Sequence, residues 1–308
     1  MPHNEGMKNN SLANNQATET FDYNKAFSRN LGYLRPEEQS LISKFCIAIP
    51  GMGGVGGHNF HALLRLGFRK FKIADLDQFG VENFNRQFGS SMSAVGRDKV
   101  EVLREIALDI NPEASIEVFP EGITTDNIES FLVDVDIVVD GLDLYASELR
   151  TPLYQRAYER NCYVVSAGPF GMGTSVMVFH PGKMSFTDYF DLEKPGLTKE
   201  AQIVRFLVGM SPWMLHTKYV TFPEAVDLIK GRLPSLHCGV YSASAALSAT
   251  VLKLALNRGE VLFAPRGMQT DFYLNKQKKF WRPWGNRNFI QRFMIKRIMK
   301  MFEMKEFY

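Results

Sequence analysis

The first residues that suggest a chemical role form a glycine-rich stretch, Gly51-Met-Gly53-Gly54-Val-Gly56-Gly57. It lies between an apolar segment expected to be a strand, residues 45–49, and a segment expected to be a helix, residues 58–66. Glycine lets the backbone turn tightly and approach a ligand closely, and the N-terminus of the following helix favours an anion. Asp75 follows at the end of the next expected strand, where a carboxylate can bond ribose hydroxyls. These residues predict a nucleotide-binding loop, and taken alone they fit NAD, FAD, S-adenosylmethionine or ATP about equally.

The segment that begins at Asp75 carries carboxylate, amide and cationic side chains. These are Asp75, Asp77, Asn83, Arg86, Gln87 and Lys99. A carboxylate that attacks the α-phosphate of ATP must overcome repulsion between two anions, and the transition state gathers further negative charge. Arg86 and Lys99 would supply fixed positive charge there, and an arginine is suited to contact a phosphate through two N–H groups. Asp143, at the end of a later strand, is placed to hold Mg²⁺ through one carboxylate.

The order of these residues resembles the signature of the ThiF/MoeB/HesA superfamily, the ubiquitin-activating-enzyme-like adenylyltransferases. The segment from Asp75 is similar to the pattern D-x-D-x-V-x-x-x-N-x-x-R-Q followed by G-x-x-K, and Asp140-Gly-Leu-Asp143 is similar to its D-x-x-D. The F-S-R-N-L stretch around Arg29 resembles an N-terminal Y-x-R-Q element, and the stretch from Ser166 to Thr174 resembles a glycine-bearing strand. The resemblance covers roughly residues 27–179 and an apolar helix expected at 239–256.

The resemblance implies an enzyme that transfers AMP from MgATP to a substrate carboxylate and releases pyrophosphate. By the resemblance, Asp75 binds the ribose, Asp143 holds the Mg²⁺ ion, and Arg29 is an arginine finger contributed across a homodimer interface. The residues that would face the phosphates are Asn83, Arg86, Gln87 and Lys99. The substrate would be the C-terminus of a ubiquitin-like protein, a peptide, or a tRNA-linked carboxylate.

Simpler interpretations of the same residues stay open at this point. Arg86 and Lys99 could be solvated surface charges, and Arg29 could pair with a nearby acid. Asp143 could cap the helix that follows it, and Asp77 could serve either a metal-proximal role or the chemistry of a turn. Two other functions also remain: an NAD-dependent oxidoreductase, and a catalytically inactive partner subunit that binds a modifier.

The cysteines depart from the pattern of the family. Sulfur-carrier activators usually carry two CxxC pairs for zinc, and ubiquitin-type activators use a cysteine in their crossover region. This chain has three cysteines, Cys46, Cys162 and Cys238, with no CxxC pair and no cysteine within residues 183–235. Cys238 is the nearest candidate, and its small neighbours favour a structural thiol. We therefore expect adenylation rather than thioester transfer.

Strand-like and helix-like segments alternate along the part of the chain that contains these residues. Strands are expected at residues 45–49, 70–74, 116–119, 133–139 and 163–167, and helices at 58–66, 99–110, 125–131 and 147–160. This alternation predicts an α/β fold with a Rossmann-like doubly wound sheet, mostly parallel, with added antiparallel strands near 171–179 and helices on its faces. The expected segments are a disordered N-terminus (1–20), an ATP-binding core (21–182), a crossover insertion (183–235), the completion of the core (236–275) and a basic amphipathic tail (276–308).

The tail concentrates the positive charge of the chain. The 308 residues carry a net charge of +3, yet from Lys276 onward ten Lys and Arg residues stand against two Glu, a net +8 that leaves −5 for the rest. A helix expected at 286–302 places aromatic residues largely on one face and basic residues on the other. It could pack on the body or on a dimer mate, lie on an anionic membrane, or contact nucleic acid. The polar, Asn-rich start predicts no secretory signal, so we expect a cytoplasmic location.

Overall fold

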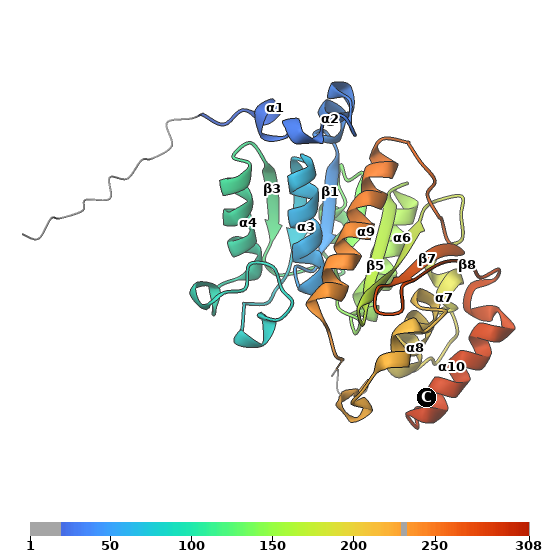
Figure 1. The fold of residues 1–308 in the computed structure, drawn as a ribbon. Coiled ribbons are helices and arrows are strands. Elements are labelled where there is room, and N and C mark those ends of the chain that lie inside the picture. The colour runs from blue at the N-terminus through green and yellow to red at the C-terminus, as the bar shows by residue number, and fades with distance from the viewer. Residues whose placement is uncertain (1–19, 229–232, 308) are drawn as a thin grey trace, which may run out of the picture.

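A single eight-stranded sheet forms the centre of the computed structural model, which describes residues 20–228 and 233–307 (Figure 1). The strand order is β3-β2-β1-β4-β5-β6-β7-β8. Five strands are parallel: β1 (Cys46–Pro50), β2 (Lys70–Ala74), β3 (Ser115–Phe119), β4 (Ile137–Asp140) and β5 (Tyr163–Phe170). Three more continue the sheet in antiparallel fashion: β6 (Gly173–Phe179), β7 (Arg266–Asp271) and β8 (Lys276–Trp281). The expected fold class is confirmed by this arrangement.

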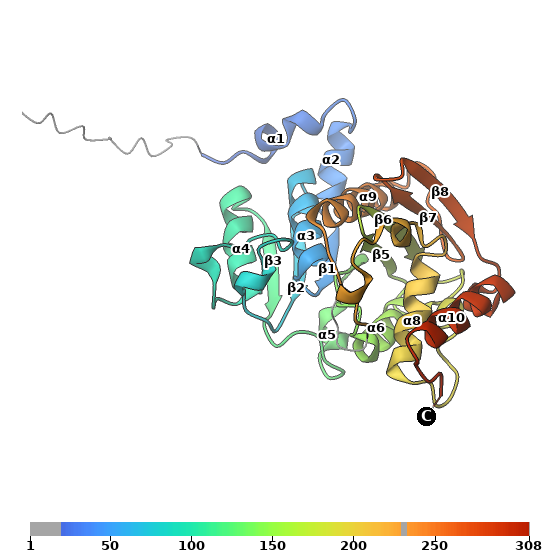
Figure 2. The ribbon, with the colours of Figure 1, turned by 60° about the horizontal axis from the view of Figure 1, so that its bottom comes forward.

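Helices cover both faces of the sheet, which is why the central strands are apolar along nearly their whole length. One buried cluster joins Ile47 and Ile49 of β1 to α3 (Gly54–Leu66), α4 (Lys99–Ile110) and α9 (His237–Ala255). The opposite face joins Ala48 of the same strand to α5 (Ile128–Phe131), α6 (Ser147–Glu159) and α7 (Phe186–Phe190). Figure 2 shows α8 (Lys199–Met210) on this second side, with α10 (Phe289–Met301) beside it. Two short helices, α1 (Tyr23–Ala26) and α2 (Pro36–Ile42), precede β1.

The helix α9 lies across the sheet beside α3, as both views show (Figures 1 and 2). By length and composition it is the one helix, among the described residues, that could cross a membrane. Its side chains Ala243, Leu247 and Val251 are nevertheless fully buried in the cluster that includes β1 and β5. In this fold α9 is a core helix, and it closes one face of the sheet.

Several segments differ from the sequence-based expectation. The helix α3 starts at Gly54, inside the glycine stretch, rather than at residue 58. Residues 276–281, expected to open the tail, form β8 and pair with β7. Three lysines in six residues made this segment resemble a tail, but lysine is also common on the open edge of a sheet. The predicted disorder of residues 1–20 concerns a segment that, apart from residue 20, lies outside the described residues.

Candidate active site

The glycine stretch lies where the sheet reverses its winding. The chain runs from β1 to β2 and β3 on one side, and β4 and β5 lie on the other, so the ends of β1 and β4 form the switch point where α/β folds bind ligands. Pairing of Pro50 with Ala74 and of Ala48 with Val138 brings Gly51, Asp75 and Gly141 to the same edge of the sheet. The predicted nucleotide loop therefore occupies the expected position in the fold.

Side chains are excluded from the floor of this loop. Gly51 has φ of +85°, and a Cβ atom there would stand 2.4 Å from the carbonyl oxygen of Gly141. A Cβ atom on Gly56 would stand 1.8 Å from the carbonyl oxygen of Gly51. At Gly53, by contrast, the nearest neighbour of a Cβ atom would be Nε2 of Gln87 at 3.9 Å. Bare backbone next to the N-terminus of α3 is a cradle that suits a phosphate group.

Asp75 braces the loop from the end of β2. Its Oδ2 accepts a hydrogen bond from the backbone N–H of Met52 at 2.6 Å, and its Oδ1 accepts one from Asp77 at 2.9 Å. Lys99, at the start of α4, donates from Nζ to Oδ2 of Asp77 at 2.8 Å and lies 3.9 Å from Oδ1 of Asp75. Only 4% of Lys99 is exposed, so it is not a solvated surface charge. Its contact with phosphate and the contact of Asp75 with ribose stay predictions.

Arg86 and Gln87 follow a turn that Asn83 holds, because Oδ1 of Asn83 accepts from the N–H of Gly80 at 2.9 Å. The side chain of Arg86 packs within 3.7 Å of where a Cβ atom on Gly54 would lie, and its Nη1 donates to the carbonyl oxygen of Glu82. Oε1 of Gln87 is buried and has no hydrogen-bond partner among the described residues. A buried unpaired oxygen is costly, so this atom fits a site that a bound molecule completes.

Asp143 follows β4 on a loop at the other side of the glycine cradle. Its Oδ1 accepts a hydrogen bond from the N–H of Tyr145 at 3.0 Å, and Oδ2 makes none within the described part of the chain. The N-terminal cap of α6 is Ala146, so Asp143 does not cap that helix. One free carboxylate oxygen beside a phosphate cradle fits Mg²⁺, which is usually bound through one or two carboxylates with phosphates and waters.

A buried arginine that sequence reasoning missed holds this loop. Arg150 of α6 donates from Nε to Oδ2 of Asp140 at 3.0 Å, and both side chains are 3% exposed. Its Nη2 donates to the carbonyl oxygens of Leu142 and Asp143 at 2.7 and 2.9 Å. The signal was available in the sequence, since Arg150 precedes Leu153 on the apolar face of a helix. Arg150 is therefore a positioning residue for the predicted metal ligand.

The carboxylate of Asp140 also accepts hydrogen bonds from two uncharged hydroxyl groups. The hydroxyl groups of Tyr154 and Ser166 donate to Oδ2 of Asp140 at 2.7 and 3.2 Å. Burial and the charge of Asp140 raise the pKa of Tyr154 well above its usual value, so the hydroxyl keeps its proton. The loop that carries Asp143 thus rests on a fully bonded buried network.

Comparison with known proteins places the chain in a family. The model of the ThiF family matches residues 27–286. The chain belongs to the ThiF family.

Relatives within and near the ThiF family are distant in sequence. The tRNA threonylcarbamoyladenosine dehydratase of Bacillus subtilis (strain 168) is 27% identical over 187 residues, which cover 58% of this chain and 73% of that protein. Ubiquitin-like modifier-activating enzyme 5 of Caenorhabditis elegans is 31% identical over 159 residues, or 47% of this chain and 37% of that enzyme. Among solved structures, that of E. coli MccB with ATP has a TM-score of 0.62 at 20% identity. The match covers 87% of this chain and 72% of the MccB chain. At that identity the structural likeness shows the fold alone.

The comparisons confirm the predicted family and, at the level of an adenylyltransferase-type enzyme, the predicted class of protein. The chain spans less than two thirds of the length of several curated relatives. The match covers 63% of the length of one further dehydratase and 39% of that of another. The substrate, the Mg²⁺ ion, the homodimer and the cytoplasmic location stay predictions for this ThiF-family chain.

Arg29 is the one predicted site residue that the structure keeps apart from the others. It is exposed in a short 3₁₀ turn, Ser28–Asn30, next to the C-terminal end of α3, where Nδ2 of Asn30 donates to the carbonyl oxygen of Leu66 at 3.0 Å. The glycine loop lies at the other end of this 13-residue helix, about 20 Å away at 1.5 Å per residue. Arg29 could reach such a site only in a second copy of the chain.

Two residues of the segment that follows α8, one before and one after residues 229–232, lie near loops that carry predicted site residues. Nδ2 of Asn85 donates to the carbonyl oxygen of Ser235 at 3.1 Å. Burial raises the pKa of Tyr145, and the charges of Asp143 and Asp227 raise it further, so both carboxylates lie within electrostatic range of the Tyr145 hydroxyl. The predicted crossover insertion, residues 183–235, therefore borders the site, although no motif within it indicated this.

Histidine and aromatic rings pack beside the glycine loop. The ring of His58, in α3, lies 5.0 Å from that of His237 and 4.8 Å from that of Tyr241. Burial and the neighbouring His237 lower the pKa of His58 to about 4. His58 is thus neutral near pH 7, which fits a packing role.

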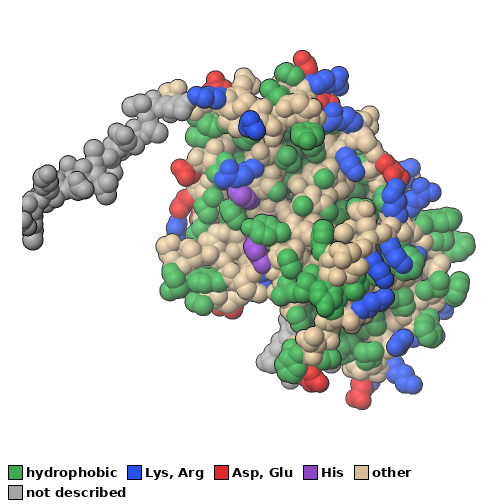
Figure 3. Space-filling view, viewed as in Figure 1, with side chains coloured by type: hydrophobic (Ala, Val, Ile, Leu, Met, Phe, Trp, Pro, Cys, Tyr) green, Lys and Arg blue, Asp and Glu red, His purple; other side chains and the backbone are tan. Residues whose placement is uncertain are grey.

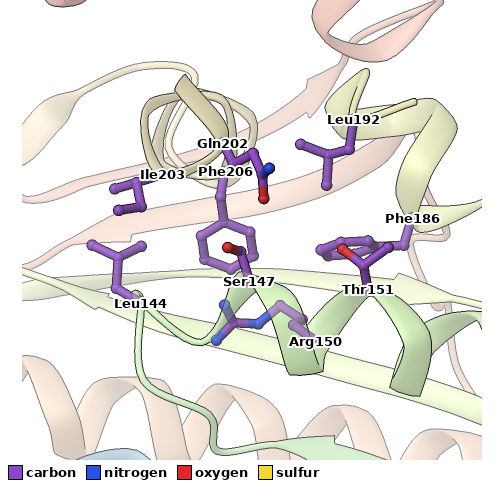
Figure 4. Close-up of a pocket in the computed structure, with 9 residues that line it drawn as sticks. All are labelled: Leu144, Ser147, Arg150, Thr151, Phe186, Leu192, Gln202, Ile203 and Phe206. Atoms are coloured by element: carbon purple, nitrogen blue, oxygen red, sulfur yellow. The ribbon is translucent and has the colours of Figure 1, made fainter. Parts of the chain in front are cut away.

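A small cavity lies behind the Asp143 loop, between α6, α7 and α8 (Figure 4). Its volume is about 10 Å³, close to the least that one water molecule needs, so a nucleotide does not fit. The guanidinium of Arg150 lies 4.5 Å from the centre of the Phe206 ring at this cavity. The cavity lies behind the Arg150 side chain that supports the Asp143 loop, and it is not a second nucleotide site.

Proposed function

We propose that this ThiF-family chain adenylates a substrate carboxylate with ATP. A carboxylate oxygen attacks the α-phosphorus and forms a new O–P bond, the bond from that phosphorus to the bridging oxygen breaks, and pyrophosphate leaves with the electron pair. The observation that carries this proposal is the bare glycine cradle at the switch point, with Arg86, Lys99 and Asp143 on the neighbouring segments.

The chain supplies positioning and positive charge to this reaction. The N–H groups at the start of α3 would hold phosphate oxygens, since they and the helix dipole favour an anion. Arg86 and Lys99 would offset the charge that gathers as the two anions meet. Lys99 is already fixed by Asp77, so little reorganisation is needed at the moment of reaction. Asp143 would hold Mg²⁺, which supplies neutralisation of phosphate charge when bound.

The acceptor is the molecule whose carboxylate receives AMP. Its classes are a ubiquitin-like C-terminus, a peptide and a tRNA-linked carboxylate, and two of these appear in the names of relatives. The hydrogen bond from Asn85 to the carbonyl oxygen of Ser235 supports an approach of the acceptor along the crossover segment. We propose that this segment selects among the three.

The test is exchange of labelled pyrophosphate into ATP, measured for the full chain with candidate carboxylates. We expect exchange that depends on one acceptor class and falls by about 10²–10³ in Arg86→Ala and Asp143→Ala. Arg104→Ala, on the exposed side of α4, is the matched control and should retain the wild-type rate. Unchanged rates in the first two variants would remove those residues from the mechanism. Binding of NADH without binding of ATP would reject adenylation altogether.

A further inference from the structure

The helix α10 carries apolar side chains on two opposite faces. On the inward face Ile295 and Met299 are buried against α8. On the outward face Phe289 and Phe293, one turn apart, are 78% and 67% exposed. A globular domain gains nothing from two large rings in water, so this outward face needs a separate explanation.

The orientation of α10 is fixed by buried amides. Nδ2 of Asn286 donates to the carbonyl oxygens of Phe190 and Arg205 at 3.1 and 2.8 Å, and Nε2 of Gln291 donates to that of Val208 at 3.1 Å. Asn286 and Gln291 are fully buried. Gln291 lies within α10, so a rotation of the helix that buried the two phenylalanines would break its bond and leave its amide unpaired. Asn286 anchors the turn that leads into the helix. The fold therefore holds the rings outward.

Basic residues surround the exposed rings. We define the α10 outer surface as the exposed apolar residues Trp281, Trp284, Phe289, Ile290, Phe293 and Met301 with the exposed cations Arg292, Lys296, Arg297 and Lys300. None of these four cations has an ion-pair partner among residues 20–228 and 233–307. Figure 3 shows green and blue side chains gathered on this side of the molecule, over β8 and α10. Positive charge and exposed apolar side chains thus occur together along α10 and the segment that leads into it.

We propose that the α10 outer surface docks on an anionic phospholipid bilayer. A helix lying in the plane of the membrane buries its apolar side chains at the boundary of the acyl chains, while its lysines and arginines contact the negative headgroups. Phe289 and Phe293 are exposed on the same helix as the four cations. Trp281 and Trp284 are the residue type that concentrates at the membrane interface.

Charge argues against a second copy of this chain as the occupant. In a two-fold dimer the same patch meets itself, so the cations of one α10 would face those of the other. Like charges brought together in an interface are unfavourable, and the region from Lys276 onward has only two acidic residues to offset ten basic ones. The negative charge of an anionic lipid surface complements these cations.

The apolar side chains favour lipid over nucleic acid. Bases stack on aromatic rings, but Ile290 and Met301 share the exposed surface and offer no planar face for stacking. Both are suited to a hydrocarbon boundary. The surface uses none of the predicted nucleotide residues, so docking and adenylation can fail independently.

Flotation with vesicles tests the proposal on the full-length chain. We expect the chain to float with phosphatidylcholine vesicles that contain phosphatidylglycerol, and to remain unbound with phosphatidylcholine alone. Lys296→Gln with Lys300→Gln should weaken binding about 25-fold, at about fivefold for each charge removed. Phe289→Ser with Phe293→Ser should weaken it by at least about tenfold, because the apolar contribution is lost. Both double variants should keep the wild-type unfolding midpoint, since the altered side chains do not pack on α8.

Two matched controls carry equivalent changes elsewhere. Tyr33→Ser removes a ring that is 89% exposed. Lys44→Gln with Lys70→Gln removes two exposed lysines, one just before β1 and one at the start of β2. Both controls should bind as the wild type does. Equal flotation with and without anionic lipid would overturn the proposal. Retention of tRNA by the wild type, lost in the α10 variants while vesicles are ignored, would assign the surface to nucleic acid instead. Conversion of a dimer to a monomer by Phe289→Ser with Phe293→Ser, again without vesicle binding, would assign it to a second copy.

Discussion

At the scale of single residues, the glycine loop offers the sharpest prediction. Gly56→Ala would force a Cβ atom against the carbonyl oxygen of Gly51, so the loop must move. Each hydrogen bond lost to a charged phosphate costs about 1.5–3 kcal/mol, so we expect ATP affinity to fall by about 10- to 100-fold. Isothermal titration of the folded variant measures it.

Gly53→Ala is the control, because a Cβ atom there would approach only Nε2 of Gln87. We expect its ATP affinity to remain within a few fold of the wild type. Equal losses in both variants would show that the close contact at Gly56 is not what matters.

Arg150 gives a prediction about stability. Arg150→Met leaves the buried carboxylate of Asp140 without its cation, which should lower the free energy of unfolding by about 3–5 kcal/mol. Arg156→Met, on the same helix but in half-exposed pairs with Glu129 and Glu159, should cost less than about 1 kcal/mol. Urea denaturation of both variants decides the matter, and similar losses would contradict the role of the buried pair.

His58 predicts a dependence of stability on pH. The unfolded chain binds a proton at His58 below about pH 6.5, whereas burial delays this in the folded protein to about pH 4. The free energy of unfolding should therefore fall as the pH drops from 6.5 to 4, by about 2–3 kcal/mol from this residue. His58→Gln removes that part of the pH dependence. Parallel curves for variant and wild type, measured by denaturation at each pH, would argue against the depressed pKa.

Residue types and spacing indicated that Asp75 and Asp143 follow the ends of β2 and β4, which lie at one edge of the sheet. The roles of these side chains toward a nucleotide stay predictions, and Arg29 lies away from them in the same chain. Residue types and spacing did not reveal how Lys99 is held by Asp77, or that Arg150 supports the Asp143 loop. Those contacts depend on how α4 and α6 pack, which is set by the tertiary structure rather than by a local pattern.

At the scale of elements, strongly patterned segments were predicted well. The strand at 70–74 and the helix at 99–110 have the bounds that the sequence indicated. The start of α3 was missed because glycine is a poor helix former, and here the close approach to Gly51 requires it. The helices α7 and α8 went unpredicted within residues 183–235, where aromatic residues and prolines obscure the periodicity.

The contact between α10 and α8 supplies a test at this scale. Met299→Ala removes a side chain that is 5% exposed and should lower the free energy of unfolding by about 2–5 kcal/mol. Met301→Ala alters the same residue type at 63% exposure and should change it by less than about 0.5 kcal/mol. Thermal or urea unfolding compares the two, and a reversed order would mean that α10 packs through its other face.

At the scale of the whole molecule, the distance between Arg29 and the glycine loop bears on assembly. If Arg29 serves the site of a second copy, Arg29→Ala and Arg86→Ala should each abolish exchange of pyrophosphate into ATP. Mixed after dissociation and reassociation, they should recover up to about a quarter of wild-type activity, because half of the dimers are mixed and each has one complete site. No recovery, with mixed dimers shown by mass, would mean that Arg29 does not act in trans.

The outer strand β8 has a consequence for the handling of this protein. No strand within residues 20–228 and 233–307 pairs with its outer side, and such an open row of backbone groups can pair with the same row of another molecule. Lysines at positions 276, 278 and 279 make that encounter repulsive, so concentrated solutions should stay free of fibres at low salt. Raising the ionic strength, or acetylating those amines, would weaken this barrier and leave the sheet able to grow from molecule to molecule.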